Sequence, residues 1–376
     1  MHVTALDSLR GLAAMYVVIH HAIQLSGLEI DHRGSSSFVQ GIIHFFSYGR
    51  FSVDLFIVLS GFCLMLPVIR NRGNLRGGVK DFFLRRASRI LPTYYLSVAF
   101  CLALIYTVIG QKTGQPWDLA LPVNFKDVVT HLLLIHDLFP DSVFKINGSF
   151  WSISVEWRIY FLFPVLLILW NYLGGIKTTS IAVVSSLLLY FVLLKTPGFN
   201  SSPIGPSIHY IGLFSMGMLA ATIVFNHGKF PPFFKNPNVW LSTVIASLLI
   251  AFSGYREIYL AGRFWLLYDV AFGLACMSFL VFVLAFEETW LRKFLNLRCL
   301  AFLGFFSYSL YLIHAPILQI IIQYLITPLS LNPDMKMMFL LVVASPVAIV
   351  ISYGFFLIAE KPFMSQRAKQ VLQIKS

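Results

Sequence analysis

Runs of about twenty apolar residues recur along almost the whole chain, and they constrain its fold more than any other feature. A run of this length crosses the hydrocarbon core of a bilayer as one helix. We place such runs near 5–25, 51–69, 93–110, 152–172, 178–194, 208–226, 238–254, 265–285, 303–326 and 337–358. Charged residues are 12% of the sequence, against roughly 25% in a soluble domain. The pattern predicts an all-α, polytopic transmembrane helical bundle of about ten spans.

The rest of the chain adds little to this bundle. The segment "VVTHLLLIHDLF" near 128–139 is too short to span and is expected to be interfacial or re-entrant. The four cysteines are far apart and form no CxxC pair, so neither a zinc site nor a disulfide framework is indicated. We see no cleavable signal peptide, internal repeat or appended soluble domain. The expectation is a single membrane-embedded domain over residues 1–376.

The orientation follows from the basic residues. With the N-terminus inside, the cytoplasmic loops and tail hold about twice as many Lys and Arg residues as the external segments, as the positive-inside rule requires. This distribution predicts an N-in, C-in topology. It also explains the net charge of +12, so no nucleic-acid partner is expected.

The first apolar run carries ionisable groups, which are costly in a bilayer and rare there without a function. Arg10 and His21 are eleven residues apart, which is about three helical turns or 16 Å, so they share one face. Asp7 is one turn from Arg10 and within its reach, whereas His20 points about 100° away. A snorkelling Asp–Arg anchor is one interpretation. The aligned stripe favours the wall of a cavity, with His21 suited to proton transfer.

Other polar residues interrupt later runs. Asp54 lies four residues after Arg50 at the start of the second run, and Ser60 and Gly61 lie deeper. Glu156 and Arg158 lie within the fourth run, and His314 lies in the middle of the ninth, where helix packing is its default role. Arg86 and Arg89 are three apart on one helical face, which suits the positive-inside rule or a phosphate-bearing ligand.

Five stretches carry a resemblance to a known family. They are "LDSLRGLAAMYVVIHH" (6–21), "VDLFIVLSGF" (53–62), "RRASRILPTYY" (85–95), "FWSISVEWRIYFLFP" (150–164) and "SYSLYLIHAPI" (307–317). In this order, and on a frame of about ten spans, the chain resembles the acyltransferase-3 family of integral membrane acyltransferases over nearly its whole length. The fragments are moderately specific singly and quite specific together.

The resemblance implies transfer of an acyl group, usually acetyl, from cytoplasmic acyl-CoA to a hydroxyl of a carbohydrate or related acceptor. The family's Arg-x10-His pattern falls on Arg10 and His21, which makes His21 the catalytic histidine. Its Arg-x-x-Arg pattern falls on Arg86 and Arg89, which, with Arg10, would bind the donor acetyl-CoA. The glutamate that follows the family's Trp-Ser pair, here Trp151 and Ser152, falls on Glu156.

The remaining site residues are assigned as hypotheses. Glu156 or Asp54 would orient His21 or stabilise its imidazolium. Arg10, Ser60 or backbone N–H groups near Gly61 would stabilise the oxyanion. Asp7, Trp151 and His314 would give substrate or structural support. No metal is expected, since adjacent helical histidines point apart and no ligand cluster is visible. "HDLFPD" (136–141) matches an acyltransferase His-x4-Asp spacing, which is a weak signal alone.

Several alternatives stay open. A proton-coupled transporter would also place ionisable groups inside spans, although no paired halves are visible. A scaffold or lipid-binding subunit leaves the Arg10–His21 stripe without purpose. The sequence does not decide whether the acceptor is a cell-surface or lipid-linked carbohydrate, or instead a lipid or small alcohol. It also does not decide between an acyl-histidine intermediate and direct transfer. The expected location is a bacterial inner membrane in contact with its lipids, and the oligomeric state is open.

Overall fold

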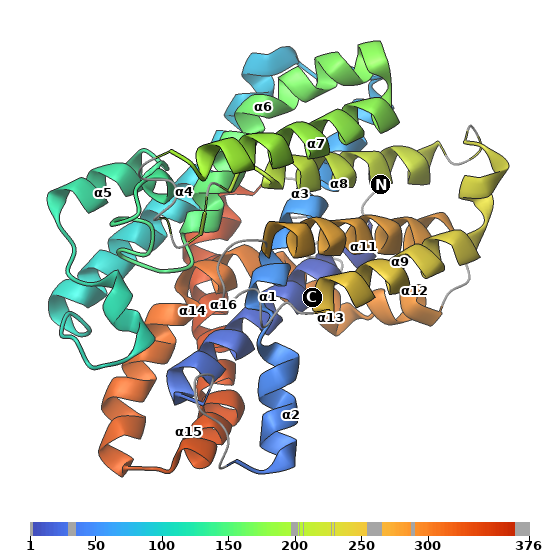
Figure 1. The fold of residues 1–376 in the computed structure, drawn as a ribbon. Coiled ribbons are helices and arrows are strands. Elements are labelled where there is room, and N and C mark those ends of the chain that lie inside the picture. The colour runs from blue at the N-terminus through green and yellow to red at the C-terminus, as the bar shows by residue number, and fades with distance from the viewer. Residues whose placement is uncertain are drawn as a thin grey trace. The chain divides into compact units, whose positions relative to one another are not determined.

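The structure is a computed structural model that describes residues 3–28, 35–196, 202, 204–205, 207–226, 228, 230–253, 265–286 and 290–364. Within these ranges every regular element is helical, which confirms the all-α expectation for this part of the chain (Figure 1). The topology prediction also used Lys and Arg residues that lie outside the described residues, at positions 33, 229, 256, 263, 367, 369 and 375.

The helices group into two compact units that interleave along the sequence. The first unit comprises Met1–Ser52, Arg85–Ser154 and Leu297–Ser376, and the second comprises Val53–Leu84 and Val155–Asn296. The predicted site residues are therefore divided, with Asp54, Ser60 and Glu156 in the second unit. Asp7, Arg10, His21, Arg86, Arg89, Trp151 and His314 are in the first.

The first unit is built around the N-terminal helix. Its α-helices are α1 (Thr4–Ser26), α2 (Ser37–Phe46), the start of α3 (Gly49–Arg70), most of α4 (Gly78–Thr107), α5 (Phe125–Leu132), α13 (Arg298–Phe305), α14 (Ser307–Ile321), α15 (Pro333–Phe339) and α16 (Ser345–Phe355). Short helical turns are η1 (Pro116–Ala120), η2 (His136–Leu138), η5 (Ile322–Ile326), η6 (Thr327–Leu329), η7 (Leu340–Ala344), η8 (Phe356–Glu360) and η9 (Lys361–Phe363). Helix α1 packs on α13 and α14, and α14 packs on α16.

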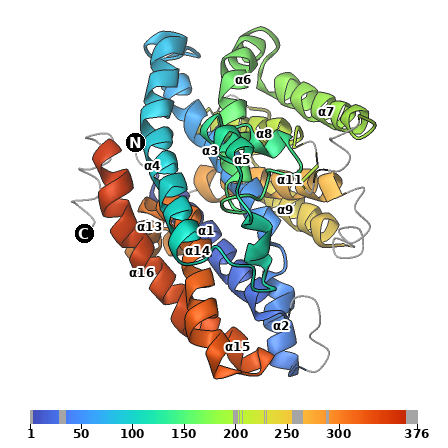
Figure 2. The same ribbon diagram turned by 90° about the vertical axis from the view of Figure 1, so that its left-hand side faces the viewer.

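Helix α4 completes this unit by running alongside α16, as Figure 2 shows. The hydroxyl of Thr93 on α4 donates to the carbonyl oxygen of Ala359 at 2.9 Å, and the rings of Phe100 and Phe355 pack together. The phenol of Tyr308 on α14 donates to the carbonyl oxygen of Ile90. These contacts hold α4, which carries Arg86 and Arg89, against α14, α16 and η8.

The second unit contains the remaining helices. They are the rest of α3, α6 (Trp151–Leu173) from Val155 on, α7 (Gly175–Leu193), α8 (Tyr210–Phe225), η4 (Pro232–Lys235), α9 (Pro237–Phe252), α11 (Trp265–Ala285) and α12 (Trp290–Leu295). Helix α8 packs on α7 and α11, and α11 packs on α9. A Cβ on Gly217 of α8 would meet the carbonyl oxygen of Val58, and one on Gly61 would meet that of Phe214. The two glycines let α3 and α8 approach closely.

Seven helices of the described residues are long and apolar enough to cross a membrane. They are Ser37–Arg70, Gly78–Thr107, Trp151–Leu173, Gly175–Leu193, Leu266–Ala285, Ser307–Leu329 and Pro333–Phe363. Helices α8 and α9 are apolar but shorter, and α1, which carries Asp7 and Arg10, is not among the seven. The count of ten spans and the N-in, C-in topology stay predictions.

Several boundaries differ from those predicted. Helix α4 begins at Gly78, well before the apolar run, because its polar first turns continue the same helix. The ninth run is divided at Phe306, which ends α13 and precedes α14. The segment near 128–139 folds as α5 and η2, and an Asn124–Asp127 capping box starts α5. Helix α2 was not predicted, because ten residues do not make a span.

Glycine sets the crossing of α1 and α13. A Cβ on Gly304 would meet the backbone of Asp7, and one on Gly11 would lie 2.8 Å from the amide nitrogen of Gly304. Only residues without a side chain fit at this point, so the two backbones touch. The crossing positions the N-terminal half of α1, which holds Arg10.

We expect Gly304→Ala to destabilise the protein by about 1–3 kcal/mol, because the added methyl group overpacks the crossing. Gly354→Ala in α16 is the matched control, since a Cβ there meets nothing within 4 Å, and alanine favours helix. Thermal unfolding in detergent measures both variants. Equal midpoints for the two would contradict the close crossing.

Candidate functional site

His21 and His314 meet directly in the first unit. Nδ1 of His21 on α1 lies 2.7 Å from Nε2 of His314 on α14. The ring planes differ by 10° and their centroids are 5.0 Å apart, so the rings meet through their nitrogen edges and not face to face. His314 is fully buried, whereas His21 is only partly buried. The sequence singled out both residues without predicting that they touch.

Helix α14 is anchored where it presents His314. Nδ1 of His314 lies 2.9 Å from the carbonyl oxygen of Leu310. Pro316 has no N–H and leaves the carbonyl of Leu312 without its usual helical donor. The side-chain amide of Asn147 donates to that carbonyl at 2.8 Å. Asn147 is fully buried, and sequence reasoning missed it, although the proline four residues after Leu312 was a visible signal.

His20 takes a different partner from His21, as its position off the stripe predicts. Its Nδ1 donates to the carbonyl oxygen of Phe46 at 2.8 Å, and the phenol of Tyr16 donates to that of Phe45 at 2.5 Å. Both carbonyls belong to the last turn of α2, where no intrahelical donor remains. His20 therefore caps α2, which is a structural role.

Arg10 forms the predicted ion pair with Asp7. Nη1 of Arg10 lies 3.6 Å from Oδ1 of Asp7, and the arginine side chain is about one-quarter exposed (23%). Trp151 receives a cation–π contact from Arg50, whose guanidinium carbon is 5.9 Å from the ring centroid. Both pairs place positive charge in the first unit beside helices α1 and α6.

Arg86 and Arg89 lie three residues apart on α4, with Arg86 half-buried and Arg89 exposed. The positive charge of Arg89 acts on the carboxylate of Glu360. Glu360 is buried and accepts hydrogen bonds from the amide of Ser309, at 3.2 Å, and from its hydroxyl, at 2.6 Å. Sequence reasoning missed Glu360, although a carboxylate at the end of the last apolar run was a visible signal.

The second unit brings Ser60 and Glu156 together through Tyr160. The phenol of Tyr160 donates to Oε1 of Glu156 at 2.5 Å, and the hydroxyl of Ser60 lies 3.2 Å from the phenol oxygen. Since a phenol has one proton, Ser60 is the donor of the second bond. Asp54 is fully buried in the same unit. The roles predicted for Ser60, Glu156 and Asp54 at His21 stay predictions.

A second polar pair in this unit escaped the sequence analysis. Nε2 of His209, just before α8, lies 3.0 Å from Oδ2 of Asp269 on α11, and both side chains are fully buried. Their pairing links the two helices. Asp269 inside an apolar run was the available signal.

A buried polar cluster lies in the segment before α6. The rings of His131 and His136 stack face to face, with centroids 3.8 Å apart. Nδ1 of His131 donates to the carbonyl oxygen of Asp127, and the carboxylate of Asp127 accepts from Ser142 at 2.7 Å. Asp137 and Ser154 are hydrogen-bonded. His136 of the "HDLFPD" stretch is thus buried in this cluster, whereas Asp141 is exposed.

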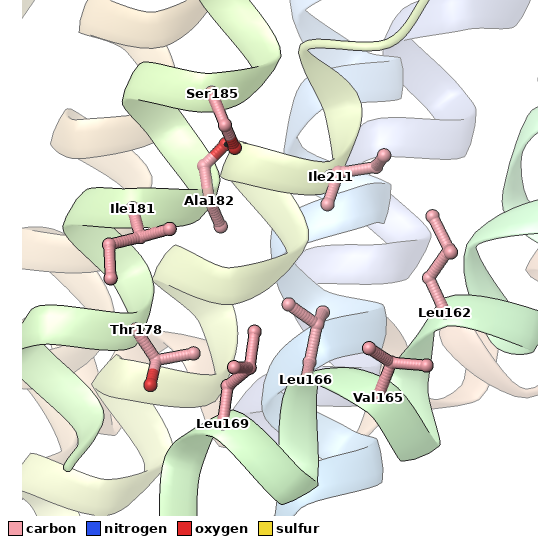
Figure 3. Close-up of a pocket in the computed structure, with 9 residues that line it drawn as sticks. All are labelled: Leu162, Val165, Leu166, Leu169, Thr178, Ile181, Ala182, Ser185 and Ile211. Atoms are coloured by element: carbon pink, nitrogen blue, oxygen red, sulfur yellow. Dashed lines mark hydrogen bonds between the residues drawn. The ribbon is translucent and has the colours of Figure 1, made fainter. Parts of the chain in front are cut away.

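The second unit also has an apolar pocket of about 130 Å³ (Figure 3). It is lined by Leu162, Val165, Leu166 and Leu169 of α6, by Thr178, Ile181, Ala182 and Ser185 of α7, and by Ile211 of α8. Its polar groups are two hydroxyls, which are poor proton acceptors near neutrality. Proton-transfer chemistry is better served by His21. In the described part of the chain, no three His, Cys, Asp or Glu residues are grouped to hold a metal.

Comparison with known proteins identifies similar sequences. The profile of a family described as "Acyltransferase domain" matches residues 3–357. The putative peptidoglycan O-acetyltransferase YrhL of Bacillus subtilis is 24% identical, over 97% of this chain and 55% of YrhL. O-acetyltransferase OatA of Staphylococcus aureus is 23% identical, over 86% of this chain and 52% of OatA. The chain thus spans about half the length of these curated relatives. No solved structure matches it.

The stacked histidines predict a loss of stability in acid. Burial lowers the pKa of His131 from 6.5 to about 4 in the folded protein. The unfolded chain therefore binds more protons between these values, so stability falls as the pH drops from about 6.5 to 4, by up to about 3 kcal/mol. We expect His131→Gln to flatten this dependence of the thermal midpoint. The exposed His44→Gln is the control, and an unchanged pH dependence in His131→Gln would refute the assignment.

Proposed function

We propose, from the premise that this chain belongs to the acyltransferase-3 family, that it is a membrane O-acyltransferase. It moves an acyl group from cytoplasmic acyl-CoA to a hydroxyl of a cell-surface or lipid-linked carbohydrate. Acetyl is the acyl group we propose, because YrhL and OatA are named O-acetyltransferases. Those relatives are about twice as long as the matched region, so O-acetyltransferase activity of this chain is part of the proposal.

The observation that carries the proposal is the arrangement of His21. It is a histidine with one ring nitrogen held by His314 and the other in a partly buried position. General bases are built in this way, since a fixed imidazole with one occupied nitrogen presents the second to a substrate. The residue also falls on the family's Arg-x10-His pattern. We therefore assign His21 as the catalytic residue.

The reaction is a substitution at the thioester carbonyl. His21 accepts the proton of the acceptor hydroxyl while the hydroxyl oxygen bonds to the carbonyl carbon of the thioester. The carbon–sulfur bond then breaks, and the CoA thiolate takes up the proton from the imidazolium. Passage through an acyl-His21 intermediate divides the same change into two substitutions. Both routes produce one ester and one free CoA thiol.

The donor is held by cations of the first unit. We propose that Arg86 and Arg89 bind the phosphates of acyl-CoA, because guanidinium groups pair bidentately with phosphate. Arg89 is exposed and Arg86 half-buried, so ligand access does not require unfolding of α4. Arg10 adds a third positive charge on α1, in its ion pair with Asp7.

The names of the relatives support a glycan as the acceptor class. YrhL is named for peptidoglycan, so a glycan hydroxyl is the acceptor that we propose for this chain. We propose that the reaction takes place in a bacterial inner membrane, and the long apolar helices support a membrane location. Its lipids would surround the helices.

The proposal is tested by His21→Ala, which should lower kcat/KM for acetyl transfer by about 10²–10⁴-fold, the contribution of a positioned base. Purified protein in detergent is supplied with radiolabelled acetyl-CoA and bacterial glycans, and labelled glycan is counted. His20→Ala is the matched control and should lose less than tenfold, since His20 contacts the end of α2. Wild-type turnover by His21→Ala would exclude the assignment.

The donor assignment has its own test. The double variant R86A/R89A should raise KM for acetyl-CoA by about tenfold or more and leave KM for the glycan unchanged, because charged hydrogen bonds contribute about 1.5–3 kcal/mol. The double variant R76A/K80A removes the same charge from exposed neighbouring positions and should change neither constant. A shift confined to the glycan KM in R86A/R89A would show that the arginines serve the acceptor.

A further inference from the structure

We propose that His314 is a positioning residue that fixes His21 as the Nδ1–H tautomer and leaves Nε2 of His21 as the base. The inference rests on the proposed function, since it names the atom at which the proton is taken. It follows from the direction of two hydrogen bonds in the first unit. His314 was expected only to give support, with helix packing as its default role.

The direction of the bonds is fixed from the buried end. A backbone carbonyl only accepts, so the bond of 2.9 Å between His314 Nδ1 and the Leu310 oxygen requires a proton on Nδ1. A neutral imidazole has a single N–H, so Nε2 of His314 carries a lone pair. The contact of 2.7 Å between the two histidines then requires His21 Nδ1 to donate. Its one proton is used there, and Nε2 of His21 is left unprotonated.

The free nitrogen is placed where a substrate can use it. Nε2 of His21 makes no hydrogen bond with any described residue. The side chain is partly exposed, whereas His314 behind it is fully buried. The two hydrogen bonds that join Leu310, His314 and His21 therefore run from a backbone acceptor inside the protein to the accessible ring nitrogen of His21. Reversal of this order would place two lone pairs or two protons between partners, which is unfavourable.

The anchoring of α14 makes the arrangement rigid. Asn147 satisfies the carbonyl that Pro316 leaves unpaired, two residues before His314. The near-coplanar rings place the shared proton along the lone-pair direction of His314. A general base gains from such pre-organisation, because less of its orientation must be fixed during the reaction.

The same bond supports the protonated state. When His21 takes the acceptor's proton at Nε2, both of its nitrogens carry hydrogen. Its Nδ1–H still donates to His314, and the bond becomes charge-assisted and stronger. A buried carboxylate in the place of His314 would do this too, but it would also bring a charge that is costly to bury. His314 supplies the acceptor and remains neutral.

Two amide variants at one position test the inference. In His314→Gln, the amide oxygen can occupy the place of Nε2 and accept from His21, whereas the shorter side chain in His314→Asn reaches only the place of Nδ1. We expect His314→Asn to lower kcat for acetyl transfer by about 100-fold with KM for acetyl-CoA unchanged, because the base loses its orientation. His314→Gln should stay within about tenfold of the wild type. Matching thermal midpoints show that both variants are folded.

Either of two kinetic results overturns the inference. One is wild-type kcat in His314→Asn, which would mean that no acceptor at the position of Nε2 is needed. The other is equal loss in the two folded variants, which would mean that an acceptor at that position does not orient His21. A purely structural role would lower the midpoint of both and would not separate kcat from KM.

A measurement without turnover separates this inference from the proposed function. Nitrogen-15 NMR of histidine-labelled protein, with the His21 signals assigned by their loss in His21→Gln, should show a protonated Nδ1 and a bare Nε2. The opposite tautomer overturns the inference even if the enzyme is active. Failure of the wild type to transfer acetyl groups would instead reject the proposed function, while the tautomer is still decided by the spectrum.

Discussion

The constraint on which this structure depends is that a polar group buried among apolar helices must find a hydrogen-bond partner. With few charged residues in the sequence, several of the buried polar groups can be followed to a specific contact. His314 joins His21, Glu360 joins Ser309, and His209 joins Asp269. Each contact joins segments far apart in the sequence, so the polar pairs link elements that the chain itself does not bring together.

Close helix crossings are a second feature of the packing. Glycines at the crossings of α1 with α13 and of α3 with α8 bring the backbones together. The carbonyl of Leu312, which lacks its helical donor because of Pro316, accepts a hydrogen bond from the side-chain amide of Asn147. This bond also anchors α14, the helix that holds His314. The position of His314 beside His21 therefore depends on Asn147, which is distant from both in the sequence.

Sequence reasoning predicted the helices well because apolar runs of this length have few alternative folds in a membrane. It singled out Arg10, His21 and His314 because an ionisable group in such a run stands out. It missed the contact between the two histidines, since helical periodicity places residues on one face but does not say which helices meet. Asn147 and Glu360 were missed for the same reason: their partners on α14 are local in space and distant in sequence. The short helix α2 gave no span-length signal.

The proposed acyl transfer is tested by the stoichiometry of the reaction. Purified, folded wild-type protein is incubated with labelled acetyl-CoA and bacterial glycan, and free CoA thiol and labelled glycan are counted together. We expect one free thiol for each acetyl group transferred to glycan, because the carbon–sulfur bond breaks as the ester forms. Absence of both products from folded protein that is given donor and glycan would contradict it, and would make the polar residues of α1 candidates for a proton path in a transporter.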